Sequence, residues 1–316
     1  MAVFMLMSVL FSSLQAEEAE LPVAVLISRE IKPFIEMVEG FEQALERPVV
    51  RIFLDKKSIP FSHDPLYKGT EIQNYDAVIA VGPSALAFLI RNRNQEKIPN
   101  QNQEKILYTM VLDPDSIIPK NVSLCGISLN LFSKVPISKI SQVFPFIKKT
   151  GVLFDPDNNS EWFRNAKMLG LFKGTTIVPV HIQKQSDVNR LYKDDLPGKN
   201  LQGKNDFSDL DALLFIPDKT VTSPTIINHI IKQSIIRKIP VIGYNRFFNK
   251  SGAALSFVLD YRSIGGQMAQ KVKGLLRGEA CKPTTPSYHM ELNMEVVKLL
   301  GLEIGTKLPL ELKRKN

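Results

Sequence analysis

The stretch AVIAVGPSALAFLI, residues 77–90, shows the pattern that decides the fold. A short apolar run ends in a Gly–Pro turn and gives way to residues at helical spacing. The same succession recurs at residues 107–116, 151–163, 212–221 and 240–248. Strands buried in a parallel sheet are continuous apolar runs, not alternating ones. The sequence therefore predicts an α/β fold with parallel sheets.

The strand–helix alternation comes in two successive blocks, which predicts two doubly wound parallel-sheet domains. The extended segments 122–130 and 253–259 are predicted to carry the chain between the domains across a hinge. Ligands of such sheets bind outside the carboxyl ends of the strands, so we expect a ligand cleft between the two domains. The expected bounds are 21–125 plus 258–280 for the N-terminal lobe and 126–257 plus 281–312 for the C-terminal lobe.

Charge and composition indicate an ordinary soluble protein of 316 residues, 44% hydrophobic and 23% charged. The formal net charge of +8 could suggest an acidic partner. However, the basic residues are scattered, and the one tight cluster, Lys313, Arg314 and Lys315, stands near the end of the chain. We interpret the excess as solvated surface and expect no binding to nucleic acid.

The first sixteen residues, MAVFMLMSVLFSSLQA, carry no charge and are followed by an acidic stretch. They are shorter than the roughly 20 residues that a membrane-spanning helix needs. They resemble a secretory signal peptide with cleavage near Ala16. We therefore expect a periplasmic or otherwise extracytoplasmic protein.

The chain has two cysteines, Cys125 and Cys281, and four widely separated histidines. Neither cysteine has a partner at metal-ligand spacing, so we expect no metal site, and no motif predicts a cofactor. The two thiols could pair in an oxidising compartment. We favour two unpaired, partly buried thiols.

Candidate ligand contacts in the first domain follow its predicted strands. Ser28 comes directly after the first strand, Asp113 after the strand at 106–112, and Ser128 lies in the segment CGIS. Pro83 and Ser84 open a helix, with Ser84 predicted as its N-cap. A helix N-terminus has free N–H groups and a partial positive charge, which suit a carboxylate. Ser84 is equally a simple cap, and Asp113 a simple turn residue.

Candidate contacts in the second domain follow its strands in the same way. Asp155, Asn159 and Ser160 come after the strand near Val152, where Asp and Asn also favour local turns and caps. Asp218 follows another strand. Its carboxylate could accept hydrogen bonds from a ligand ammonium, or it could cap a helix that begins near Thr220.

The last predicted cleft strand ends at Gly243, and Tyr244 and Asn245 follow it. They could flank a ligand side chain by stacking and hydrogen bonding. No GxSxG elbow is present, and GGQMAQ at 265–270 is no dinucleotide fingerprint. We therefore expect a binding protein and no catalytic residues.

The ordered set of motifs resembles a known family, the tryptophan/tyrosine-type ABC transporter substrate-binding proteins. The signature stretch is PVIGYNRFFNKSGAALSFVLDYRSIGGQMAQKV, residues 240–272, and the resemblance extends over residues 21–304. The residues of this chain that match the family pattern are Gly243, Gly252, Ala253, Asp260, Tyr261 and Gly265.

This resemblance implies a periplasmic-binding-protein type I fold and the role of solute-binding component of an ABC importer. The implied partners are a small ligand, an ABC permease and its ATPase subunit, and we expect a monomer. The ligand would be an amino acid or a similar zwitterion held between two hinged lobes. Two alternatives stay open: a periplasmic sensing subunit that presents its bound form to a receptor or kinase, and a two-domain α/β enzyme.

Overall fold

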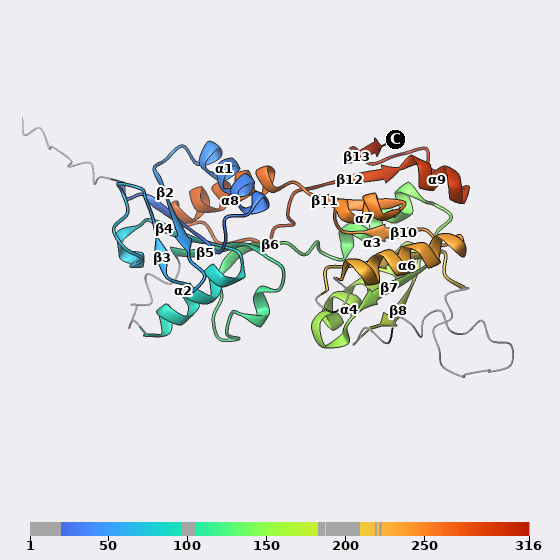
Figure 1. The fold of residues 1–316 in the computed structure, drawn as a ribbon, viewed down its shortest axis with the longest axis horizontal. Helices are drawn as coiled ribbons and strands as arrows, with labels where there is room; N and C mark the ends of the chain where they lie inside the picture. The colour runs from blue at the N-terminus through green and yellow to red at the C-terminus, as the bar shows by residue number, and fades with distance from the viewer. Residues whose placement is uncertain are drawn as a thin grey trace, which may run out of the picture.

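The protein forms two lobes, each built on one sheet, as the computed structural model in Figure 1 shows. The predicted leader, residues 1–16, lies outside the described residues. No helix within the described ranges is long and apolar enough to cross a membrane. The structure describes residues 20–95, 105–182, 187, 209–218, 220 and 223–315.

The N-terminal lobe has a six-stranded sheet in the order β3-β2-β1-β4-β5-β6, parallel except for β3. Its strands are β1 (Val23–Ile27), β2 (Val49–Leu54), β3 (Pro60–Phe61), β4 (Ala77–Val81), β5 (Ile106–Val111) and β6 (Cys125–Ser128). Its helices are α1 (Lys32–Leu45), α2 (Pro83–Gln95) and α8 (Tyr261–Leu276), with the 3-10 turns η1 (Ile72–Asn74) and η3 (Pro114–Ser116).

The C-terminal lobe has a seven-stranded sheet in the order β13-β12-β11-β10-β9-β7-β8, in which β11 and β12 run antiparallel. Its strands are β7 (Lys149–Phe154), β8 (Thr176–His181), β9 (Ala212–Phe215), β10 (Val241–Gly243), β11 (Leu255–Leu259), β12 (Tyr288–Asn293) and β13 (Leu312–Lys315). Its helices are α3 (Lys134–Val143), α4 (Pro156–Lys173), α6 (Pro224–Ile236), α7 (Arg246–Ser251) and α9 (Met294–Leu300).

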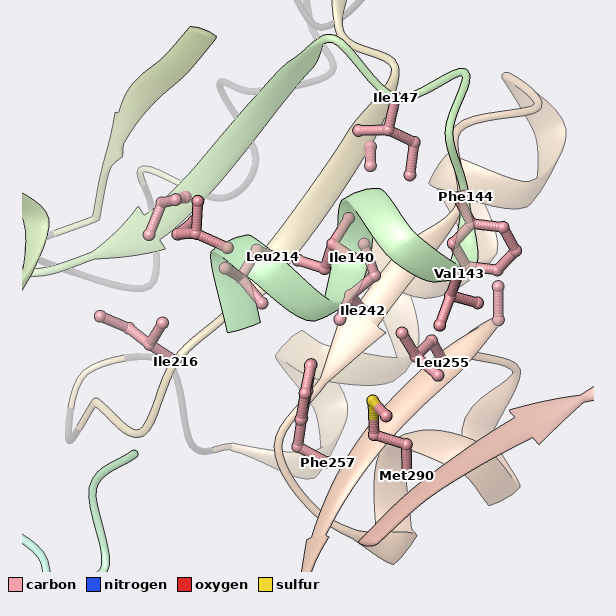
Figure 2. Packing of buried hydrophobic residues seen from close by; sticks show 14 of the residues in the cluster. Ile140, Val143, Phe144, Ile147, Leu214, Ile216, Ile242, Leu255, Phe257 and Met290 are labelled. Carbon is pink, nitrogen blue, oxygen red and sulfur yellow. The ribbon is translucent and has the colours of Figure 1, made fainter. Parts of the chain in front are cut away.

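Helices cover both faces of each sheet, which explains the continuous apolar runs. In β9, Leu214 packs into one cluster with α3 and α4, while Leu213 and Phe215 pack into the other cluster with α6. Figure 2 shows the first of these clusters, where Ile140 and Val143 of α3 lie against the strands. Successive strand side chains point to opposite faces, so a strand buried on both faces must be apolar throughout.

The chain passes between the lobes after β6, after β11 and after α8, which packs on α1 in the N-terminal lobe. The sequence predicted crossings within 122–130 and 253–259. Both segments instead contain sheet strands, and each crossing begins only where its strand ends. The edge strand β13 was not predicted, because the charged run Lys313–Lys315 is typical of a solvated terminus. It pairs in parallel with β12.

Candidate functional site

A cavity of about 450 Å³ is lined by residues of both lobes. The N-terminal lobe contributes the segments that follow β5 and β6, and the C-terminal lobe contributes the start of α4 and the loop after β9. These segments follow strands of the two parallel sheets, so the cavity lies at the sheet edges where ligands of α/β folds bind.

Four of the sequence-predicted residues line this cavity: Asp113, Ser128, Asn159 and Asp218. The other candidates, which do not line it, are Ser28, Pro83, Ser84, Asp155, Ser160, Tyr244 and Asn245. The structure thus brings together two candidates from each lobe.

Asp218 is the centre of a polar network at the edge of the C-terminal lobe. Its side chain is 1% exposed, and its Oδ2 accepts hydrogen bonds from Asp155 N at 2.8 Å and Asn159 Nδ2 at 2.7 Å. Its Oδ1 accepts a hydrogen bond from Thr220 N at 2.9 Å. The carboxylate therefore does make the local contact near Thr220 that the sequence suggested, and contact with a ligand stays a prediction.

Asp155 completes this network as the N-cap of α4. Its Oδ1 accepts a hydrogen bond from Asp157 N at 3.0 Å, and its Oδ2 accepts one from Thr220 Oγ1 at 2.7 Å. The neighbouring Ser160 hydroxyl donates to the carbonyl of Pro156 one turn earlier in the helix. These bonds fix the start of α4, which carries Asn159 to the cavity.

Tyr244 packs against Phe248, with the two ring centroids 4.8 Å apart. Burial, together with the negative charge of Asp218, raises the pKa of the Tyr244 hydroxyl to about 12. The adjacent Asn245 caps α7, and its Oδ1 accepts hydrogen bonds from Phe247 N at 2.9 Å and Phe248 N at 3.3 Å. Tyr244 therefore keeps its proton at neutral pH beside the buried carboxylate.

Ser28, Pro83 and Ser84 meet at the edge of the N-terminal lobe. The predicted N-cap role of Ser84 is wrong, because α2 begins at Pro83 and Leu86 N already donates to Gly82 O. The side-chain oxygen at this helix end comes from Ser28, whose Oγ accepts a hydrogen bond from Ala85 N at 2.8 Å. A cap supplied by another strand leaves no signal in the local sequence.

Gly82 makes this close approach possible. Its φ of +90° lies in the left-handed region, and a Cβ there would stand 2.8 Å from Ser28 Oγ and 2.6 Å from the Phe34 ring. Glycine alone adopts this positive φ without strain and has no Cβ to clash with Ser28 and Phe34. The turn between β4 and α2 is thus closed around the Ser28 hydroxyl.

Asp113 and Ser128 lie on the N-terminal side of the cavity. Ser128 Oγ donates to Leu112 O at 3.2 Å and accepts from Asn130 N at 3.1 Å, which fixes the chain at the first crossing. Asp113 precedes the 3-10 turn η3, without a side-chain cap bond. The turn interpretation of Asp113 is compatible with its place on the cavity wall.

One face of α4 was missed by the sequence analysis. Glu161, Trp162 and Asn165 lie at helical spacing from Asn158, which follows the strand as Asp155 does, and all four line the cavity. Trp162 Nε1 donates to Leu131 O at 2.9 Å, which joins α4 to the crossing segment. The signal was a polar and aromatic stripe on a helix that directly follows a strand.

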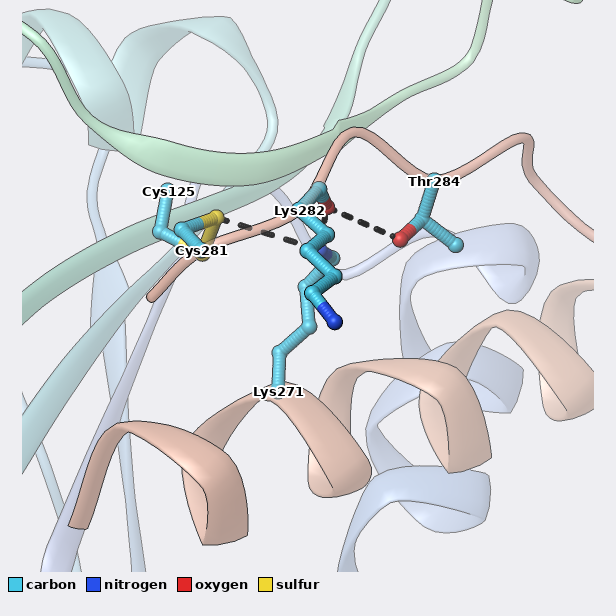
Figure 3. The surroundings of a disulfide bond; sticks show 5 residues. All are labelled: Cys125, Lys271, Cys281, Lys282 and Thr284. Carbon is cyan, nitrogen blue, oxygen red and sulfur yellow. Dashed lines mark hydrogen bonds between the residues drawn. A yellow bond between two sulfur atoms is a disulfide. The ribbon is translucent and has the colours of Figure 1, made fainter. Parts of the chain in front are cut away.

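The favoured interpretation of two unpaired thiols is wrong, because Cys125 and Cys281 form a disulfide with their Cα atoms 5.6 Å apart (Figure 3). Cys125 begins β6, and Cys281 lies on the segment that returns to the C-terminal lobe after α8. The cysteines are separated by 156 residues, so only the fold brings them together. Lys271 Nζ lies 3.8 Å from Cys281 Sγ, and burial lowers its pKa.

No group of three or more His, Cys, Asp or Glu is placed to hold a metal ion within the described ranges. The cavity offers carboxylates, amides and aromatic rings. Such a lining can bind a small polar molecule by hydrogen bonds and ring contacts. The chain thus has two α/β lobes with a lined cavity where their sheet edges face each other.

The chain belongs to the ABC transporter substrate binding protein family, whose model matches residues 119–308, more than half of the 316 residues. Members of this family bind substrates rather than convert them, and they are typically extracytoplasmic. No significant match was found among curated protein sequences.

Solved structures show the same fold at low sequence identity. A ligand-free, open substrate binding protein with adhesive properties from Clostridium difficile is 16% identical, with TM-score 0.63, covering 94% of this chain and 100% of that one. A Streptococcus pneumonia ABC domain in complex with L-Trp is 16% identical, with TM-score 0.57, covering 92% and 99%. A conserved domain protein from Vibrio cholerae is 18% identical, with TM-score 0.57, covering 94% and 99%. The predicted type I periplasmic-binding-protein fold is confirmed.

Proposed function

We propose that this protein is the solute-binding component of an ABC importer and holds one small solute between its two lobes. The observation that carries the proposal is the cavity lined from both lobes, beside the segment of the first crossing. A solute that contacts both lobes favours the closed arrangement over the open one, because it gains contacts only when the lobes approach.

The proposed solute is an amino acid or a similar zwitterion. Carboxylates and amides on the cavity wall suit an ammonium group. The start of α2, with Pro83 and Ser84 beside Ser28, would face the carboxylate when the lobes close. Tyr244, Asn245, Asp155 and Ser160 belong to the same lobe as Asp218, and they stay proposed contacts of the solute side chain. The L-Trp bound to the Streptococcus protein supports this class of solute by analogy.

The proposed setting follows from the same role. The chain would act outside the cytoplasm as a monomer after removal of its leader near Ala16. It would deliver its solute to a permease that is driven by a separate ATPase subunit, and it would carry out no covalent chemistry itself.

Mass spectrometry of gently purified protein would identify a copurifying solute. After the solute is stripped, its return at a hundredfold excess over Kd should stabilise the fold by about 2.7 kcal/mol, because only the native state binds it. Trp162→Phe changes the cavity wall and should reduce this thermal shift, whereas Tyr288→Phe, away from the cavity, should not. The proposal is overturned if nothing copurifies and no amino acid, nucleoside, sugar or oxyanion stabilises the stripped protein.

A further inference from the structure

The cavity between the lobes has a charge opposite to that of the whole chain. Four carboxylates line it, and none of the described lining residues is Lys, Arg or His; the acidic residues are Asp113, Asp115, Glu161 and Asp218. The chain as a whole has 40 Lys and Arg against 32 Asp and Glu. If the cavity were lined by residues in the proportions of the whole chain, it would carry more basic than acidic residues.

Two of these carboxylates are not engaged by the protein. Asp115 in η3 and Glu161 in α4 make no hydrogen bond or ion pair within the part of the chain that the structure describes. They stand on opposite lobes, so a solute between the lobes has one on each side. Like charges that approach when two lobes close oppose closure, unless a cation lies between them.

Asn159 provides a second, independent sign of a bound donor. Its side chain is 9% exposed, and its Nδ2 donates to Asp218 Oδ2 at 2.7 Å and to Pro217 O at 3.4 Å. These bonds fix the amide orientation, because only the amino group can donate to a carboxylate. Asn159 Oδ1 accepts no hydrogen bond from the described residues, although Asn159 lines the cavity. An acceptor on the cavity wall whose orientation is fixed in this way suits a donor on the solute.

The aromatic residues of the cavity suit a cation as well. The indole N–H of Trp162 donates to Leu131 O, so only the face and edge of the ring can contact a solute. Phe132 is not counted among these contacts, because Lys134 Nζ already lies 5.8 Å from its ring centroid. Tyr108 lies near Asp115, and burial followed by that negative charge raises the pKa of its hydroxyl. Rings of this kind attract ammonium and guanidinium groups within about 6 Å.

We propose that the solute of this cleft carries a net positive charge, with an ammonium or guanidinium group held between Asp115, Glu161 and Asn159. This inference rests on the proposed solute-binding function and narrows its ligand class. A cationic amino acid satisfies it, because its α-carboxylate and α-ammonium cancel and its side chain adds the cation.

The test compares solutes that differ by one positive charge. Calorimetric titration of stripped protein uses L-arginine against L-citrulline and L-lysine against L-norleucine, at low and at high salt. We expect at least one cationic member to bind about tenfold or more tightly than its neutral counterpart. That advantage should shrink with added salt, because salt screens interactions between exposed charges.

Variants of single carboxylates show which of them contribute to binding of the cationic probe. Glu161→Gln and Asp115→Asn should each lower the affinity for the cationic probe about two- to fivefold, as expected for exposed ion pairs. Glu303→Gln removes an exposed carboxylate of the C-terminal lobe that does not line the cavity, and it should leave the affinity unchanged. Equal losses in all three variants would mean that only the overall field of the protein acts, which overturns the inference.

The remaining outcomes separate the inference from the proposed function. If a neutral or anionic solute binds and the cationic probes do not, the net-positive class is wrong and solute binding stands. If neutral and cationic members of each pair bind equally, the inference is also overturned. If neither these probes nor any copurified solute binds, both the inference and the proposed function fall.

Discussion

The polar edges of the two lobes are built differently. In the N-terminal lobe one hydroxyl, that of Ser28, receives one backbone N–H, that of Ala85. In the C-terminal lobe the Asp218 carboxylate accepts hydrogen bonds from three donors on two segments, and the Asp155 carboxylate accepts three more. One edge is closed by a single neutral contact, and the other by a network around buried carboxylates.

This difference indicates where a solute would be oriented. A charged network fixed before binding holds its polar groups without further ordering cost, which favours affinity. At the edge that carries Ser28, the turn at Gly82 packs closely against the Phe34 ring. We therefore expect the C-terminal lobe to hold the polar part of the solute first, and the N-terminal lobe to cover it on closure.

The largest effect is expected where the network has its centre. Asp218→Ala leaves Asp155 N and Thr220 N without an acceptor, and leaves Asn159 Nδ2 with only its 3.4 Å contact to Pro217 O. Unpaired buried donors cost about 1–3 kcal/mol each. We expect the free energy of unfolding to fall by about 4 kcal/mol, measured by urea denaturation. Asp218→Asn keeps the shape of the side chain and one acceptor oxygen, so its free energy of unfolding should fall by less. A loss below about 1 kcal/mol in Asp218→Ala would show that the network is dispensable.

Loss of the disulfide should come next. Cys125→Ser combined with Cys281→Ser opens a link across 156 residues, and native disulfides contribute about 2–4 kcal/mol by restricting the unfolded chain. We expect a decrease of about 3 kcal/mol in the unfolding free energy under oxidising conditions. In reducing buffer the native and the variant protein should become equally stable. A native protein insensitive to a strong reductant while its thiols are shown to be free would contradict this account.

The single contact of the N-terminal edge should matter less. Ser28→Ala removes the acceptor for Ala85 N, and loss of a helix cap typically costs about 1 kcal/mol. Ser84→Ala is the matched control, because Ser84 lies inside the helix rather than at its cap. Thermal unfolding of both variants distinguishes them. A larger loss in Ser84→Ala than in Ser28→Ala would reverse the assignment of the cap.

The smallest effect on stability is expected from Tyr244, and only at high pH. The Tyr244 pKa of about 12 lies above the value of about 10 in an unfolded chain. The stability linked to this proton is therefore fully present below pH 10 and is lost as the pH rises toward 12. Tyr244→Phe should flatten the fall in urea midpoint between pH 10 and 12. An unchanged pH profile in the variant would mean that Tyr244 ionises as freely as in water.

Much of the fold could be predicted because burial on both faces imposes apolar runs. The strand at Ala77–Val81 and the helix at Met294–Leu300 were predicted with these same bounds. Gly278, predicted to end α8, follows that helix with a φ of +74°. Local residue preferences and the pattern of burial agree at these positions, so the sequence alone is sufficient there.

The site was only partly predictable because a cavity is a property of the assembled lobes. Asn159 and Asp218 were found because they follow strands. Trp162 and Asn130 were missed because one lies two turns into a helix and the other on the crossing segment. Asn245 was predicted to face a ligand, but its side-chain oxygen caps α7. A cap and a ligand contact use the same residue types, so the sequence does not separate them.

Small-angle X-ray scattering tests the central claim most directly, since a solute that joins both lobes must change their separation. The measurement compares stripped protein with protein saturated with its copurified solute, and repeats both with Trp162→Phe. The account predicts a smaller radius of gyration for the saturated native protein and a weaker or absent change in the variant at the same solute concentration. An unchanged radius at proven saturation would contradict binding between two closing lobes.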